Sequence, residues 1–241
     1  MPKIRKVLAT ALLLLVSVIT SNIALANSAV LDLLQVNSAI KSLDATIDAF
    51  VQHQIDAGNL SSADAKAVSN NISAKMGSKA VQRKLERYLA NNASTLNGQV
   101  ASLLNHPMAD RVKTYQQKLK QTPTSKVDRN LNKIKRLGHS KKRSELIRRL
   151  NKAVPLANFA AIAQTAIEQA VAEAANQSIS DGADRLASRN KQLISRASAL
   201  NHYTYRFFSD QQLEDWVSRL EQDDIQRYVK QIRNGLAAAL K

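Results

Sequence analysis

The chain has 241 residues, a formal net charge of +16 and no cysteine. The absence of cysteine excludes a disulfide scaffold, so stability has to come from a packed core or from a partner. Six glycines and four prolines are few for this length, and no stretch of alternating β-branched residues is present, so the composition favours helices throughout.

The first 26 residues have the pattern of a secretory signal peptide. Basic residues at 3–6 precede an apolar run at 7–19, and Ala-Leu-Ala at 24–26 supplies a cleavage pattern of small residues. The apolar run is shorter than the roughly 20 residues that a membrane-spanning helix needs. We therefore expect export to the periplasm with cleavage after Ala26, and an uncleaved N-terminal anchor is the alternative.

The first half of the remaining chain reads as a series of amphipathic helices. Apolar residues recur at three- and four-residue steps from about Ser28 to Ala57, which predicts one long helix. Shorter helices are expected after Gly58 and after Gly77, followed by a helical hairpin at 96–104.

The clearest helix start in the second half is at Ser209. Ser209 and Gln212 have the spacing of a capping box, and Phe208 and Leu213 flank them at the positions of a hydrophobic staple. Asp223 is expected to cap the last helix, since aspartate is a favoured N-cap residue.

The two halves also resemble each other. A shift of 117 residues places Leu213 on Leu96, and a shift of 114 matches 150–154 to 36–40. Two unrelated amphipathic helices can also align at some offset, so a chance match is the alternative. We predict an all-α multi-helix bundle with a first helical repeat at 27–120, a basic helical connector at 121–140 and a second helical repeat at 141–241.

The C-terminal hairpin, 208–216 followed by 220–225, resembles a family of exported Gram-negative helical proteins known only as a domain of unknown function. In that family a Ser/Thr-capped amphipathic helix turns through a Ser-Pro-x-Gly-like sequence into a second helix. Here Asp223-Asp224 replaces Ser-Pro, and in the first copy (103–109) Ala109 stands in place of the glycine. The resemblance implies an exported helical fold and brings no catalytic residues with it.

The sequence offers little that could carry catalysis, and we predict no catalytic residue, no metal site and no cofactor. The four histidines are scattered without the spacing of metal ligands, and no nucleophile elbow or glycine-rich phosphate loop is present. Carboxylates at Asp44, Asp48 and 214–224 could in principle serve a glycosidase. Solvated helix faces and helix caps explain them more simply, so an envelope hydrolase that uses the C-terminal carboxylates is the alternative to a non-enzymatic protein.

Aromatic residues cluster near the C-terminus, at 203–208, 216 and 228. An aromatic cluster of this kind can line a ligand pocket. Packing of the last hairpin against the preceding helix is the simpler interpretation, so we predict that these residues belong to the core.

The positive charge is concentrated in one segment. The chain has 7 basic and 7 acidic residues at 27–110, and 10 of each at 153–241. At 111–152 there are 15 basic residues and only two acidic ones. A solvated face kept for solubility is one explanation, but solubility does not require all the charge in one place. We predict that this segment binds anions, through Lys126, Arg129, Lys133, Lys135, Arg136, Lys141, Lys142 and Arg143.

A patch this basic attracts anionic surfaces through its long-range field. For an exported protein the expected partners are anionic lipid, lipopolysaccharide or an acidic protein surface. Nucleic acid would bind through the same electrostatic attraction, but the predicted export of the protein leads away from nucleic acid as a natural target. A structural or chaperone-like interaction module that uses apolar grooves is a further alternative.

Overall fold

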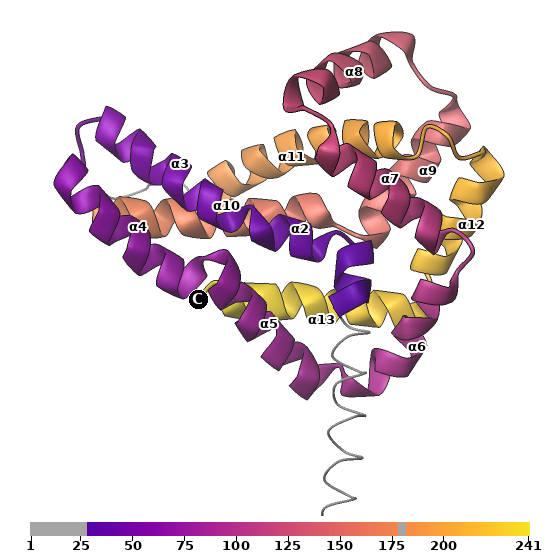
Figure 1. The fold of residues 1–241 in the computed structure, drawn as a ribbon, viewed down its shortest axis with the longest axis horizontal. Coiled ribbons are helices and arrows are strands. Elements are labelled where there is room, and N and C mark those ends of the chain that lie inside the picture. Colours follow the sequence, from indigo (N-terminus) through magenta and orange to yellow (C-terminus); the bar gives the residue numbers. More distant parts are fainter. Residues whose placement is uncertain (1–27, 178–181) are drawn as a thin grey trace, which may run out of the picture.

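The computed structural model describes residues 28–177 and 182–241, so the predicted signal peptide lies outside the described part of the chain (Figure 1). Over these two ranges the regular structure is helical and no β-strand occurs, which confirms the predicted all-α bundle. Within the same ranges, no helix combines the length and the apolar character that crossing a membrane requires.

Residues 28–33 are helical and lead into a series of helices of different lengths. The first group is α2 (Val36–Lys41), α3 (Leu43–Asp56), α4 (Ser62–Met76) and α5 (Ser78–Asn92). Short helical turns follow: η1 (Ser94–Leu96), α6 (Asn97–Ala101) and η2 (Ser102–Asn105). The rest is α7 (Ala109–Gln121), α8 (Thr124–Leu137), α9 (Lys141–Ala153), α10 (Leu156–Ala174), α11 (Gly182–Thr204), α12 (Asp210–Leu220) and α13 (Asp223–Ala239).

Helices from the two predicted repeats pack directly on each other. α5 packs on α13 and α3 packs on α10, while α10 and α11 form a helical pair (Figure 1). One continuous core includes Leu85 of α5, Ile167 of α10 and Ile225 of α13. α8 lies on α11 at the periphery, at the top of Figure 1. The origin of the two halves by repetition stays a prediction.

The long helix predicted from Ser28 to Ala57 is wrong, because the chain breaks twice. Gln35 has a left-handed backbone with φ +63°, and Ser42 separates α2 from α3. Near the first break, the buried side chain of Gln116 in α7 donates a hydrogen bond to the carbonyl of Leu33 (3.1 Å). One helix can bury only one face. The break allows the apolar residues on both sides of it to be buried: Val30, Leu31, Leu33, Leu34 and Val36.

The helix start at Ser209 is confirmed. Gln212 N donates to Ser209 Oγ and Ser209 N donates to Gln212 Oε1, each at 3.1 Å, which completes the capping box. The flanking Phe208 and Leu213 are both buried, as expected for a staple. The expected cap at Asp223 is wrong: Gln222 is the N-cap residue, and Asp223 lies in the first turn, where its charge favours the helix dipole.

The contact between α5 and α13 depends on a glycine. A Cβ atom at Gly235 would lie 2.7 Å from Leu85 Cδ1 and 2.8 Å from Tyr88 Cδ1. These distances are shorter than a van der Waals contact, so a larger residue at position 235 would require the side chains of Leu85 and Tyr88 to move.

Gly235→Ala is therefore expected to lower the free energy of unfolding by about 1–3 kcal/mol through overpacking, against a gain in helix propensity of at most ~1 kcal/mol. Gly98→Ala is the control, because Gly98 is helical and a Cβ there meets no atom within 4 Å. It should leave stability unchanged or raise it by up to ~1 kcal/mol. Urea unfolding measures both, and equal effects of the two substitutions would contradict the proposed helix contact.

Candidate anion-binding surface

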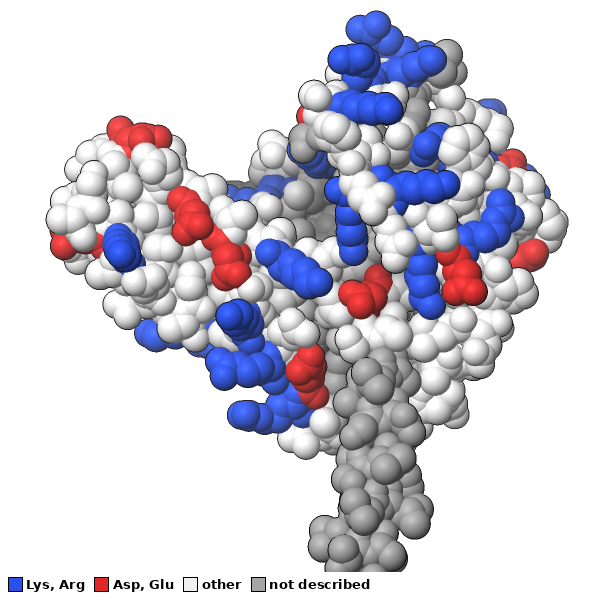
Figure 2. Space-filling view, in the orientation of Figure 1, with Lys and Arg blue, Asp and Glu red and all other residues white. Residues whose placement is uncertain are grey.

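The eight residues predicted to bind anions divide between two helices. Five lie on α8 and three lie at the start of α9. On α8 the side chains of Lys126, Arg129, Lys133 and Arg136 are exposed, and the side chain of Lys135 lies outside the described structure. Figure 2 shows Lys and Arg gathered at the top of the molecule, where α8 lies.

α8 exposes most of its surface because its apolar stripe is narrow. Val127 and Leu131 pack against Ala199 and Tyr203 of α11, and this small cluster is separate from the main core. Asn130 Nδ2 adds a hydrogen bond to Tyr203 Oη (3.2 Å). A helix attached along one narrow stripe leaves its other faces to water, and on α8 those faces carry the basic residues.

The exposed cations of α8 have little negative charge near them. Asp128 is the one acidic residue in the helix, and its carboxylate lies 3.9 Å from Arg196 of α11. Across the described chain, no carboxylate forms an ion pair with the four exposed cations, Lys126, Arg129, Lys133 and Arg136. Their positive field therefore extends into solvent.

Two of the predicted site residues on α9 contact α12 and the residue before its cap. Arg143 Nε lies 3.2 Å from Asp210 Oδ1, and a second guanidinium nitrogen donates to the carbonyl of Phe208 (2.5 Å). Lys142 lies 3.2 Å from Glu214, but both side chains are substantially exposed, so this pair adds little stability. Of the predicted site residues on α9, Lys141 is exposed, whereas the charges of Lys142 and Arg143 are compensated by carboxylates of α12.

Arg149 extends this contact between α9 and α12. Its guanidinium donates two hydrogen bonds to the Glu221 carboxylate, at 3.1 and 2.5 Å. The hydrogen bond from Arg149 holds the pKa of Glu221 below its ordinary value. Arg219 likewise forms two 3.0 Å hydrogen bonds with Asp224 and lowers the pKa of that carboxyl.

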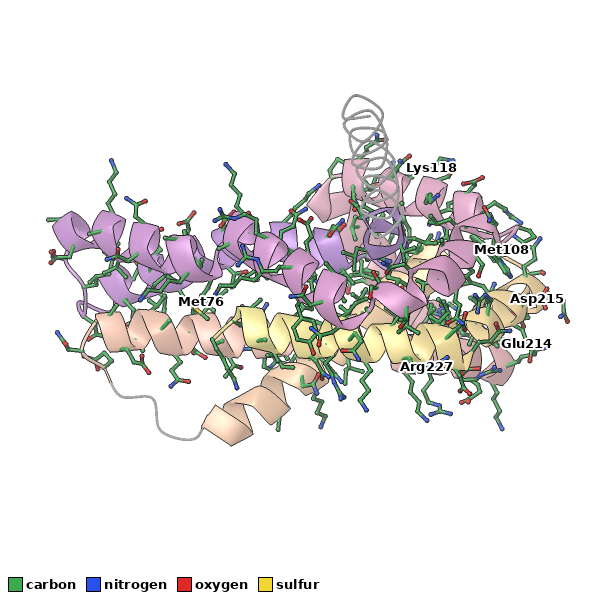
Figure 3. The ribbon with its side chains drawn as sticks, turned by 90° about the horizontal axis from the view of Figure 1, so that it is seen from below. Met76, Met108, Lys118, Glu214, Asp215 and Arg227 are labelled. Carbon is green, nitrogen blue, oxygen red and sulfur yellow. The ribbon has the colours of Figure 1, made fainter. Side chains whose placement is uncertain are left out.

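These ion pairs bear on the carboxylates considered for a hydrolase. A general acid at neutral pH needs a raised pKa, and the pKa values of Glu221 and Asp224 are lowered. Figure 3 shows Glu214 and Asp215 at the end of the molecule opposite the turn between α3 and α4.

Two carboxylates of α3, Asp44 and Asp48, connect it to the next helices. Asp44 accepts a hydrogen bond from Ser78 N (3.0 Å) at the start of α5, and Asp48 accepts one from Ser69 Oγ (2.9 Å) in α4. Both therefore have structural partners, in agreement with their interpretation as caps and polar-face residues.

Two of the scattered histidines meet near the end of α8. The rings of His139 and His202 stack with their centroids 3.7 Å apart and an interplanar angle of 6°. Burial, then the neighbouring His139 and Arg143, lower the pKa of His202 to about 4. In the ranges 28–177 and 182–241, no three His, Asp or Glu side chains gather as a metal site would require.

One residue of the aromatic cluster differs from the predicted burial in the core. The rings at 203, 205, 208, 216 and 228 are buried as predicted, but Phe207 is 58% exposed. Its ring lies 5.5 Å from that of Tyr115 in α7, and the guanidinium of Arg206 lies 4.3 Å from its centroid. The adjacent pair Phe207-Phe208 was the available signal, because neighbouring side chains rarely face the same core.

No protein-family model, curated protein or solved structure matches the chain. The resemblance of the C-terminal hairpin to an exported Gram-negative family therefore stays a prediction, and the function has to be inferred from the geometry.

Removing the charge of Arg143 on α9 should lower the free energy of unfolding more than removing a charge from the exposed face of α8. Arg143→Gln should lower the free energy of unfolding by about 1–3 kcal/mol, because the Phe208 carbonyl and Asp210 lose a charged donor. Lys133→Gln should change it by less than ~0.5 kcal/mol, as is usual for a surface position. Thermal melts of the two variants measure the difference. An equally large loss of stability in Lys133→Gln would contradict the assignment of a structural role to Arg143 and of a solvent-exposed position to Lys133.

Stability should also depend on pH through His202. An unfolded histidine has a pKa near 6.5, above the value of about 4 in the fold. Between these values the unfolded chain binds more protons, so the melting temperature should fall as pH is lowered from about 6.5 to 4. His202→Gln should make this dependence shallower. An unchanged slope in His202→Gln would be the contrary result.

Proposed function

We propose that the protein is a non-enzymatic, exported helical protein that binds an anionic lipid surface of the bacterial envelope through α8. The observation that carries the proposal is the contrast within one basic segment. Three cations of α9 pair with carboxylates of α12 or of the turn after it, namely Lys142, Arg143 and Arg149, while the four exposed cations of α8 have no described carboxylate paired with them. Cleavage after Ala26 and a periplasmic location are part of this proposal.

The charge on α8 is large enough to support binding. A basic residue close to an anionic membrane contributes roughly 1 kcal/mol. Four such residues would contribute about 4 kcal/mol, or close to three orders of magnitude in affinity. Because the residues are exposed, salt should screen most of this attraction.

A lipid surface is favoured over nucleic acid on two grounds. α8 carries no aromatic side chain that could stack on bases, and the predicted export route leads away from nucleic acid. Phospholipids and lipopolysaccharide both present phosphate groups, so the shared ligand chemistry is a lipid-borne phosphate.

A hydrolase that uses the C-terminal carboxylates is the less favoured function. Glu221 and Asp224 keep lowered pKa values in ion pairs with arginines, which suits structural partners better than proton donors.

The test compares two variants that lose the same charge. One is Lys126→Gln, Arg129→Gln, Lys133→Gln and Arg136→Gln on α8; the control is Lys66→Gln, Lys75→Gln, Arg87→Gln and Arg233→Gln on α4, α5 and α13, all at exposed positions. Binding to phosphatidylglycerol and to phosphatidylcholine vesicles is measured by co-sedimentation across a salt series. Circular dichroism checks that both variants stay helical.

We expect salt-sensitive binding of the unmodified protein to anionic vesicles only. The α8 variant should lose most of its affinity, by about a hundredfold or more, and the control should lose much less. Lipopolysaccharide micelles as a separate arm identify the source of the phosphate. Equal losses in the two variants, equal binding to neutral vesicles, or tighter binding to duplex DNA at the same salt would overturn the proposal.

A further inference from the structure

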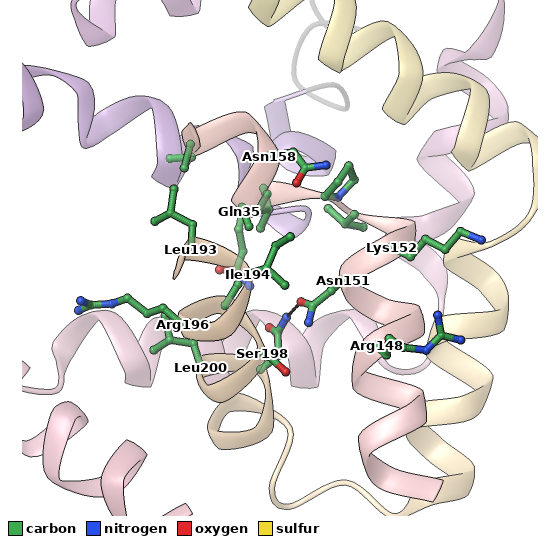
Figure 4. Close-up of a pocket in the computed structure, with 18 of the residues that line it drawn as sticks. Gln35, Arg148, Asn151, Lys152, Asn158, Leu193, Ile194, Arg196, Ser198 and Leu200 are labelled. Atoms are coloured by element: carbon green, nitrogen blue, oxygen red, sulfur yellow. Dashed lines mark hydrogen bonds between the residues drawn. The ribbon is translucent and has the colours of Figure 1, made fainter. Parts of the chain in front are cut away.

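A second site lies away from the exposed cations of α8, where α2, α9, α10 and α11 meet. The four elements surround a cavity of about 620 Å³ that opens to the surface (Figure 4). Sites for small molecules in proteins span roughly 300–1,000 Å³. The cavity is therefore large enough for a small ligand.

The cavity exists because small residues face each other at a break between helices. α9 and α10 are separated by Val154 and Pro155, and the left-handed turn at Gln35 lies beside this junction. Close packing normally fills such a junction with side chains. Here the facing positions are alanines, which leave the space open: Ala39, Ala157, Ala160 and Ala197.

Large apolar side chains line one part of the cavity. Leu156 of α10 and Leu193, Ile194 and Leu200 of α11 all line it. Ile194 is 43% exposed, and it is one of two large apolar side chains in the described chain that are exposed. Covering this surface with an apolar group would stabilise a complex by roughly 0.8 kcal/mol for each buried methylene.

The charges around the cavity have one sign. Arg148 and Lys152 of α9 stand on one side and Arg196 of α11 stands on the other, and no carboxylate belongs to the lining (Figure 4). Arg148 is paired with Glu145 outside the cavity, and Arg196 lies 3.9 Å from Asp128. Lys152 forms no ion pair with any carboxylate of the described ranges, although its charge helps to lower the pKa of Glu221, and its exposed side chain is accessible to a ligand.

A polar contact joins the two walls. Asn201 Nδ2 of α11 donates a hydrogen bond to Asn151 Oδ1 of α9 (2.7 Å), and Figure 4 shows Asn151 on the side of α9 that faces α11. The contact connects the wall that carries Lys152 to the wall that carries the apolar residues of α11. A ligand held here would meet both walls in a fixed arrangement.

We propose that this cavity binds a single-chain anionic amphiphile, with its alkyl chain against the apolar wall of α10 and α11 and its anionic group near Lys152. A fatty acid and a lysophospholipid share this chemistry. The inference goes beyond binding of a membrane surface and rests on different residues, so either proposal can fail without the other.

The protein contains its own reporter for such binding. Trp216 is the single tryptophan of the chain and is buried. It lines a small cavity of about 30 Å³ that shares Gln35, Val154, Leu156 and Asn201 with the larger one. A ligand in the larger cavity should therefore change the fluorescence of Trp216.

The experiment titrates the full chain with laurate and with lysophosphatidylglycerol, each below its micelle concentration. Dodecyl maltoside and dodecyltrimethylammonium provide neutral and cationic probes with the same chain length as laurate. Fluorescence of Trp216 and titration calorimetry give affinity and stoichiometry. We expect one molecule bound per chain, with the neutral and cationic probes at least about tenfold weaker than the anionic ones.

Two substitutions test the location. Ala197→Leu fills the cavity and should abolish saturable binding, while Ala90→Leu on the exposed side of α5 is the control and should not. Lys152→Glu should weaken the anionic probes by about tenfold and leave dodecyl maltoside unchanged, whereas Lys75→Glu on α4 should change neither.

Binding of laurate alone or of lysophosphatidylglycerol alone supports the site and identifies the source of its ligand. The proposal is overturned if no anionic probe saturates, if the three head-group charges bind equally, or if Ala197→Leu and Lys152→Glu both bind like the unmodified protein. Should Ala197→Leu fail to fold by circular dichroism, Lys152→Glu alone decides, because its position is at the rim of the cavity.

Discussion

Two arginines of α9 hold α12 in place, and the distribution of charge over the rest of the surface depends on them. Arg143 reaches Asp210 and the carbonyl of Phe208, and Arg149 reaches Glu221 and Glu214. These contacts compensate cations that would otherwise join those of α8. As a result, a basic segment that looks uniform in the sequence contains cations of α9 with acidic partners as well as cations of α8 that face solvent.

α11 connects the two proposed sites. On one side it supports α8 through Ala199 and Tyr203, and on another it forms a wall of the cavity through Leu193 and Ile194. Arg196 contacts both sites, because it lines the cavity and lies near Asp128 of α8. A lipid bound in the cavity and a membrane bound by α8 would therefore act on the same helix.

The features that could be predicted from sequence are those set by neighbouring residues. The capping box at Ser209 and the helical composition are local, so the spacing and propensity of a few residues were sufficient. The break at Gln35 depends on burial of apolar residues on both sides and lies near the hydrogen bond from Gln116 to Leu33, 83 residues apart. No local pattern contains that information.

The basic segment and the cavity show the same difference between local features and contacts that are distant in sequence. The sequence located the basic segment, and the exposed side chains of Lys126, Arg129, Lys133 and Arg136 agree with an exposed surface. It could not show that Arg143 and Arg149 have acidic partners, because Arg149 and Glu221 are 72 residues apart. The cavity was also hidden, since alanines at four positions leave a space only when three helices bring them together.

Hydrogen–deuterium exchange of the full chain, with and without phosphatidylglycerol vesicles, tests the central claim most directly. Membrane contact through α8 predicts slower exchange in peptides from Thr124–Leu137, with little change in α4 or in the α9–α12 contact. Protection confined to other helices, or an α8 that exchanges at the same rate on vesicles as in solution, would contradict the account.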